Sequence, residues 1–86
     1  MTINRTTMAG WTAEALQELG GSATIFDVCK SVWLKHGDEI TAAGDLFYKW
    51  QYEIRWAADI LRRDGVLASV EVSPRGVWQL ASVASV

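Results

Sequence analysis

The chain has 86 residues, of which 50% are hydrophobic and 21% are charged, and its formal net charge is −2. This apolar content predicts one small folded domain and excludes an intrinsically disordered chain. The acidic balance excludes a polycation that binds nucleic acid through bulk charge alone. A single Cys and a single His exclude a disulfide framework and a multi-Cys zinc site, and we expect no metal and no cofactor.

The chain divides into three parts by composition. Residues 1–7 are polar and are expected to be disordered or loosely ordered, residues 8–80 are expected to form the domain, and residues 81–86 form a short apolar tail. The N-terminus lacks the apolar run of a signal peptide, and no stretch approaches the ~20 apolar residues of a membrane span. We therefore expect a cytoplasmic protein without a membrane partner.

The first helix is predicted over residues 8–19. Apolar side chains recur there at spacings of three and four, which places them on one helical face: Met8, Trp11, Ala15, Leu16 and Leu19. Gly20 and Gly21 are expected to end the helix, since glycine accepts the left-handed conformation that a helix C-terminus needs.

The second helix is predicted over residues 25–36. Thr24 has the side chain of an N-cap, Asp27 follows three residues later as in a capping box, and Gly37 is expected to end the helix. The expected inward side chains are Ile25, Phe26, Cys29, Val32, Trp33 and His36. Residues 38–44 are predicted to form a loop or a short helical turn.

The third helix is predicted over residues 45–64, ended by Gly65. Its inward arc consists of Leu46, Phe47, Trp50, Ile54, Ala57, Ala58 and Leu61. Trp56 lies at the edge of this arc, where it would complete the core, form a partner surface or stack on a base. Of the other tryptophans, Trp11, Trp33, Trp50 and Trp78 are expected to point inward.

After Gly65 the apolar side chains recur at every second residue, the spacing of a β-strand. Residues 66–72 and 77–80 are predicted to form two strands, joined by the turn signal of residues 73–76. A very short strand at residues 23–25 would pair with this hairpin. The resulting order predicts a mainly helical α+β fold of the winged helix-turn-helix type, with three helices followed by a two-stranded β-hairpin wing.

Four segments also resemble a known family. They are residues 20–24 (GGSAT), 50–57 (WQYEIRWA), 61–67 (LRRDGVL) and 75–80 (RGVWQL). In this order and spacing they resemble the N-terminal winged-helix domain of Mrr-like restriction-system proteins, over roughly residues 8–80. The resemblance implies DNA binding that directs a separate nuclease domain. Residues 81–83 depart from the family pattern and we expect no nuclease domain to follow them, so the resemblance implies binding and not cleavage.

The outward face of the third helix and the hairpin tip supply the candidate DNA contacts. They are Tyr48, Lys49, Gln51, Tyr52, Arg55, Arg62 and Arg63, with Arg75 in the wing turn. Arginine bonds guanine edges and glutamine bonds adenine, while tyrosine and lysine bond phosphates. The alternative is a solvated face with local ion pairs, since Asp59 lies four residues after Arg55.

No catalytic constellation stands out. Cys29 and His36 are seven residues apart, about 10 Å along a helix, which is too far for a nucleophile and its base. We therefore predict a non-enzymatic protein that binds double-stranded DNA as a transcription regulator or as a targeting module of a restriction-type system. The alternative is a winged-helix module for protein interaction or homodimerisation without DNA binding, favoured by Leu34 and the apolar tail.

Overall fold

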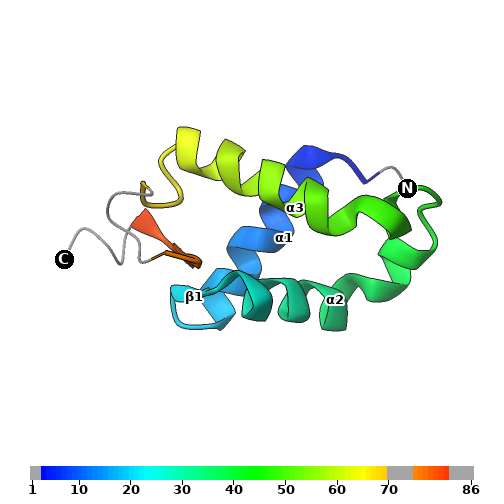
Figure 1. The fold of residues 1–86 in the computed structure, drawn as a ribbon, viewed down its shortest axis with the longest axis horizontal. Helices are drawn as coiled ribbons and strands as arrows, with labels where there is room; N and C mark the ends of the chain where they lie inside the picture. The colour runs from blue at the N-terminus through cyan, green and yellow to red at the C-terminus, as the bar shows by residue number, and fades with distance from the viewer. Residues whose placement is uncertain (1–2, 70–74, 82–86) are drawn as a thin grey trace.

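A computed structural model describes residues 3–69 and 75–81 of the chain. The elements are α1 (Arg5–Glu18), β1 (Ser22–Thr24), α2 (Ile25–Thr41), α3 (Leu46–Arg63) and β2 (Val77–Gln79). The predicted mainly helical α+β class is confirmed, with three helices and a two-stranded antiparallel sheet. Figure 1 shows α1 crossing behind α2 and α3, with the sheet at one end and the α2–α3 turn at the other.

Helix α1 begins three residues before its predicted start. The Asn4 side chain caps it by accepting a hydrogen bond of 2.9 Å from the Thr7 N–H, so residues 5–7 form its first turn. The predicted end is confirmed, because Gly20 and Gly21 follow the helix with φ of 90° and 95°.

Helix α2 is longer than predicted, because Gly37 does not end it. A Cβ added at Gly37 would lie 3.2 Å from the Trp33 ring, so this glycine gives the indole room to lie against the helix. The helix continues to Thr41 and places Ile40, which is fully buried, in the core. Residues 38–41, predicted to form a loop or a short helical turn, therefore continue α2, and His36 lies within the helix instead of at its end.

The core confirms the predicted face of α3 apart from Phe47, which is 41% exposed, and corrects that of α2. Trp50, Ile54, Ala57, Ala58 and Leu61 are all buried on α3. On α2 the buried side chains are Val28, Val32 and Ile40, whereas Phe26 is 73% exposed. Trp50 and Trp78 are buried as predicted, but Trp11 and Trp33 are only partly covered.

β2 forms hydrogen bonds along both of its edges. One edge of β2 pairs with β1, with Ala23 opposite Trp78, which confirms the short extra strand one residue earlier than predicted. On the other edge the Ala68 N–H donates to the Gln79 carbonyl at 2.8 Å, beside an isolated bridge between Leu67 and Leu80. The rest of the predicted hairpin, residues 70–74, lies outside the described residues.

The start of α2 supplies a test of the fold. Thr24 Oγ1 accepts a hydrogen bond of 3.1 Å from the Asp27 N–H, which confirms the predicted N-cap. Thr24→Ala should lower the free energy of unfolding by about 1 kcal/mol in urea denaturation, since one N–H loses its partner. Thr24→Ser keeps the acceptor oxygen and should retain most of that stability. Equal losses in the two variants would contradict the cap.

Candidate nucleic-acid interface and the neighbouring groove

The exposed side of α3 carries a stripe of aromatic and basic side chains. Tyr48, Tyr52, Arg55 and Arg63 recur at spacings of three, four and eight residues, so they lie along one side of the helix. Tyr48 is 85% exposed and Tyr52 is 58% exposed, and both arginines are exposed as well. We call these four residues the α3 stripe.

Charge is distributed unevenly among the three helices. Helix α3 carries four basic and two acidic residues, a formal charge of +2. Helices α1 and α2 each carry one more acidic than basic residue, with histidine counted as neutral. The chain is acidic overall, yet its basic side chains are concentrated on the helix that presents the stripe.

One arginine beside the stripe is partly neutralised. Arg62 Nη1 lies 2.8 Å from Asp59 Oδ1, and the Arg62 side chain is only 24% exposed. Within residues 3–69 and 75–81, no carboxylate lies within ion-pair distance of Arg55 or Arg63. The local pairing expected for this face therefore involves Arg62 and leaves the two arginines of the stripe available.

The other predicted contact residues are not on the stripe. Gln51 lies on the side of α3 that faces α2, and Lys49 lines a depression beside the N-terminus of α1. Arg75 is exposed next to Gly76, whose carbonyl accepts a hydrogen bond from the first N–H of α2. The predicted DNA-contact residues thus separate into the α3 stripe, which runs along one side of α3, and single residues at other positions.

Trp56 does not complete the core. Its ring is 42% exposed, and the Arg5 guanidinium lies 5.0 Å from the ring centroid. Arg5 also forms an ion pair of 2.9 Å with Glu53. The first turn of α1 therefore covers this side of α3, a contact that the sequence did not predict.

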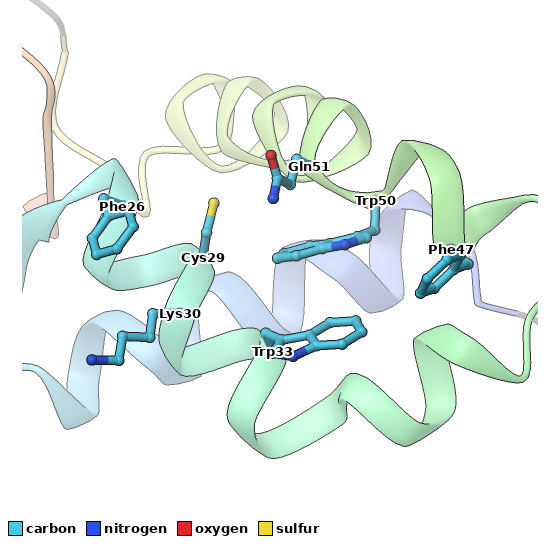
Figure 2. Close-up of a pocket in the computed structure, with 7 residues that line it drawn as sticks. All are labelled: Phe26, Cys29, Lys30, Trp33, Phe47, Trp50 and Gln51. Atoms are coloured by element: carbon cyan, nitrogen blue, oxygen red, sulfur yellow. The ribbon is translucent and has the colours of Figure 1, made fainter.

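An apolar groove runs between α2 and α3. It has a volume of about 590 Å³ and is lined by Phe26, Cys29, Lys30, Trp33, Phe47, Trp50 and Gln51. Figure 2 shows aromatic rings from both helices along it, with the Lys30 ammonium directed away from the rings. We call this feature the aromatic groove.

Stacked rings form the floor of the aromatic groove. The ring centroids of Trp33 and Trp50 are 5.5 Å apart with an interplanar angle of 19°, and Phe47 lies 6.3 Å from Trp33 (Figure 2). Trp33 is 37% exposed and Phe47 41% exposed, although both were predicted to lie in the core. Sequence periodicity missed this surface because it detects apolar side chains without showing what covers them.

Cys29 and His36 face different neighbours. Burial raises the pKa of the Cys29 thiol, and the positive charge of the nearby Arg55 acts in the opposite direction. Cys29 lines the groove beside α3, whereas His36 contacts Glu14 of α1. The two side chains do not form a nucleophile–base pair.

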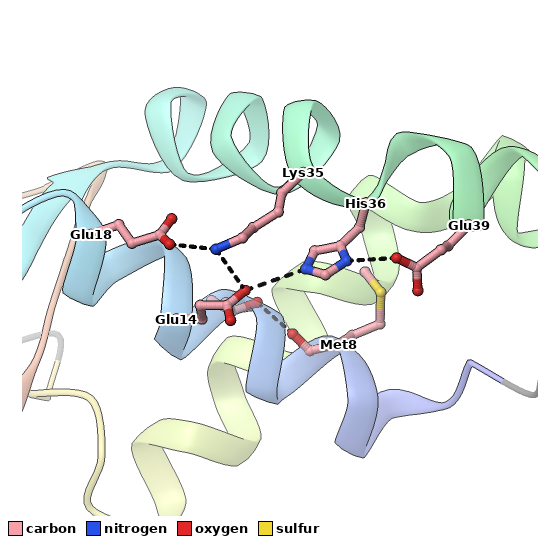
Figure 3. Close-up of polar contacts among 7 residues, drawn as sticks. Met8, Glu14, Glu18, Lys35, His36 and Glu39 are labelled. Atoms are coloured by element: carbon pink, nitrogen blue, oxygen red, sulfur yellow. Dashed lines mark hydrogen bonds and ion pairs between the residues drawn. The ribbon is translucent and has the colours of Figure 1, made fainter.

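A polar cluster joins α1 to α2 on another part of the molecule (Figure 3). His36 Nδ1 lies 3.0 Å from Glu39, and its Nε2 lies 3.3 Å from Glu14. Lys35 pairs with Glu14 at 3.5 Å and also with Glu18. Each carboxylate has a basic partner from α2, so the cluster fastens the two helices together.

Trp11 completes this helix–helix contact. Its ring stacks on His36 with a centroid separation of 3.9 Å and an interplanar angle of 5°.

In the part of the chain that the structure describes, no group of three or more His, Cys, Asp or Glu side chains is arranged to hold a metal ion. No helix in that part combines the length and the apolar content of a membrane crossing.

Comparisons with protein-family models, with curated proteins and with solved structures gave no match to this chain.

The polar cluster predicts a pH-dependent stability. The hydrogen bond from His36, together with the charge of Lys35, holds the pKa of Glu14 below its ordinary value of 4.5. The ionised carboxylate therefore stabilises the fold above the pKa that it has in the unfolded chain, and this stabilisation is lost as the pH falls through the lower folded pKa. Glu14→Gln should be less stable than the native chain in urea at pH 7, and the difference should shrink toward pH 3.

Asp38→Asn is the matched control for that experiment. Asp38 is an exposed carboxylate on α2 that forms no ion pair among the described residues. Its substitution should change stability little at either pH. A loss for Glu14→Gln that is the same at pH 3 and pH 7 would contradict the electrostatic role of the cluster.

Proposed function

We propose that this protein is a winged-helix module that binds double-stranded DNA without cleaving it, with α3 as the recognition helix. The element order supports the fold assignment, since β1 lies between α1 and α2, and β2 follows α3. The pairing of β2 on both edges, with β1 and with residues 67–68, is what a wing strand at the centre of its small sheet would show.

The observation that carries the proposal is the concentration of positive charge on α3. In a helix-turn-helix protein the second helix of the motif enters the major groove, and here that helix would be α3, which follows α2 after a short turn. It has a formal charge of +2 in a chain of net charge −2. A duplex would approach the most positive helix and avoid the acidic side of α1 and α2.

The α3 stripe has suitable chemistry for this contact. Exposed arginines bond guanine edges or phosphates with two parallel hydrogen bonds, and the tyrosine hydroxyls bond phosphates. Arg62 would have to exchange its bond to Asp59 for one to DNA. With so few available cations, the affinity is expected to be modest and strongly dependent on salt.

The resemblance to Mrr-like N-terminal domains supports the same proposal and adds a role. A module of this kind would act as a regulator or would bring a separate nuclease to DNA. Arg75, at the sheet end of the molecule, would contact the flanking backbone. The second candidate is a protein-interaction or dimerisation module, which the exposed apolar side chains favour, among them Leu34 at 75% exposure.

Charge substitutions on α3 test the proposal. Arg55→Ala and Arg63→Ala should each weaken duplex binding about fivefold to tenfold, measured by fluorescence anisotropy at several salt concentrations. Each should also reduce the slope of log affinity against log salt by about 0.9, if the lost contact was to a phosphate. Asp59→Asn should strengthen binding, because it removes a negative charge and releases Arg62.

Lys35→Gln is the matched control, because it removes one positive charge from the α1–α2 side of the molecule. Its effect on duplex affinity should be small. The assignment of α3 as the recognition helix is wrong if Lys35→Gln weakens binding as much as Arg55→Ala, or if Asp59→Asn weakens it. Failure of the native chain to bind any duplex at low salt would remove the proposed function itself.

A further inference from the structure

The aromatic groove is an apolar surface that the described part of the chain leaves open. Among its lining residues, Phe26 is 73% exposed, and Trp33 and Phe47 are each more than one third exposed. Such contiguous apolar side chains at a concave site are typical of surfaces that bind another molecule. The volume of about 590 Å³ is enough for several aliphatic side chains.

The charged residue that lines the groove is basic, namely Lys30. Arg55 lies one helical turn after Gln51 of the lining, and its positive charge acts on the Cys29 thiol. Asp27, also on α2, lines a neighbouring depression instead. No carboxylate lines the groove among the described residues. An occupant that combines apolar side chains with carboxylates would therefore match both the surface and its rim.

Two other occupants fit less well. A second copy joined by a two-fold axis would place this patch against itself, so Lys30 and Arg55 would face a surface whose lining offers them no carboxylate. DNA would match the charge, but its backbone needs many cations and gains little from aromatic rings that lie on the floor of a groove. Aliphatic side chains of a protein segment would bury those rings best.

We propose that the aromatic groove is the docking site for an amphipathic helical segment of a partner protein, which inserts aliphatic side chains between α2 and α3 and pairs its carboxylates with Lys30 and Arg55. This recognition follows the helix-in-groove mode, in which apolar anchors at helical spacing supply most of the contact. The apolar part of the site can be tested separately from DNA binding, because Phe26, Trp33 and Phe47 are not part of the α3 stripe, whereas Arg55 is shared by the two proposed surfaces.

A pair of synthetic peptides tests the proposal. Both have 14 residues with leucines at helical spacing, and the remaining positions are glutamate-rich in one peptide and lysine-rich in the other. Each is titrated into the full ¹⁵N-labelled chain while the indole N–H signals of Trp33 and Trp50 are followed by NMR. The glutamate peptide should shift both signals and should bind at least about tenfold more tightly than the lysine peptide.

Two substitutions on α2 form a matched pair for this titration. Phe26→Ala should weaken the glutamate peptide about tenfold, whereas Leu34→Ala, of similar exposure but outside the groove, should leave it unchanged. Lys30→Glu should reduce the ratio between the affinity for the glutamate peptide and the affinity for the lysine peptide. Neither Phe26 nor Leu34 is buried, so both alanine variants should remain folded, which circular dichroism will verify.

Several outcomes would overturn the proposal. Unshifted indole signals, or equal affinity for the two peptides, would exclude an acidic amphipathic segment. Shifts that depend on protein concentration without peptide would identify a second copy as the occupant. Loss of duplex binding in Phe26→Ala would make the groove part of the DNA surface. The two proposals fail separately, since Arg63→Ala tests the α3 stripe and should not change peptide binding.

Discussion

The close packing of α3 on α1 is the constraint on which the rest of the structure depends. Among the helices and strands that the structure describes, these two share the most extensive contact, and α3 contributes a fully buried Ile54 beside two buried alanines, Ala57 and Ala58. Small side chains let a neighbouring helix approach closely, while the larger ones fill the remaining space. With its inner face held in this way, α3 has a defined outer face.

That outer face has two neighbouring surfaces of different chemistry. The α3 stripe is basic and aromatic and faces solvent, whereas the aromatic groove is apolar and lies between α3 and α2. No residue of α1 lines the groove, and α1 crosses behind α2 and α3 (Figure 1). The same packing that secures the core thus leaves the junction of α2 and α3 open.

The two surfaces are adjacent, with consequences for how they would work together. Gln51 lines the groove, whereas Arg55, one turn later on α3, belongs to the stripe. Burial raises the pKa of the Cys29 thiol, which lines the groove, and the positive charge of Arg55 opposes that rise. A protein segment in the groove and a duplex on the stripe would both contact the Arg55 guanidinium. Their affinities would then be linked, and by thermodynamic reciprocity each ligand would change the binding of the other by the same factor.

The sequence by itself determined the number and order of the helices, the buried face of α3 from Trp50 to Leu61, the Thr24 cap and the turn at Gly20 and Gly21, because each depends on local spacing or backbone conformation. Only the tertiary structure decided which apolar side chains of α2 are covered. Periodicity treats Phe26 and Val28 alike as apolar, but in the folded chain Val28 is fully buried in the core and Phe26 is exposed. The continuation of α2 through Gly37 also needed the fold, since Ile40, beyond the glycine, is fully buried in the core, and the local sequence does not show that burial.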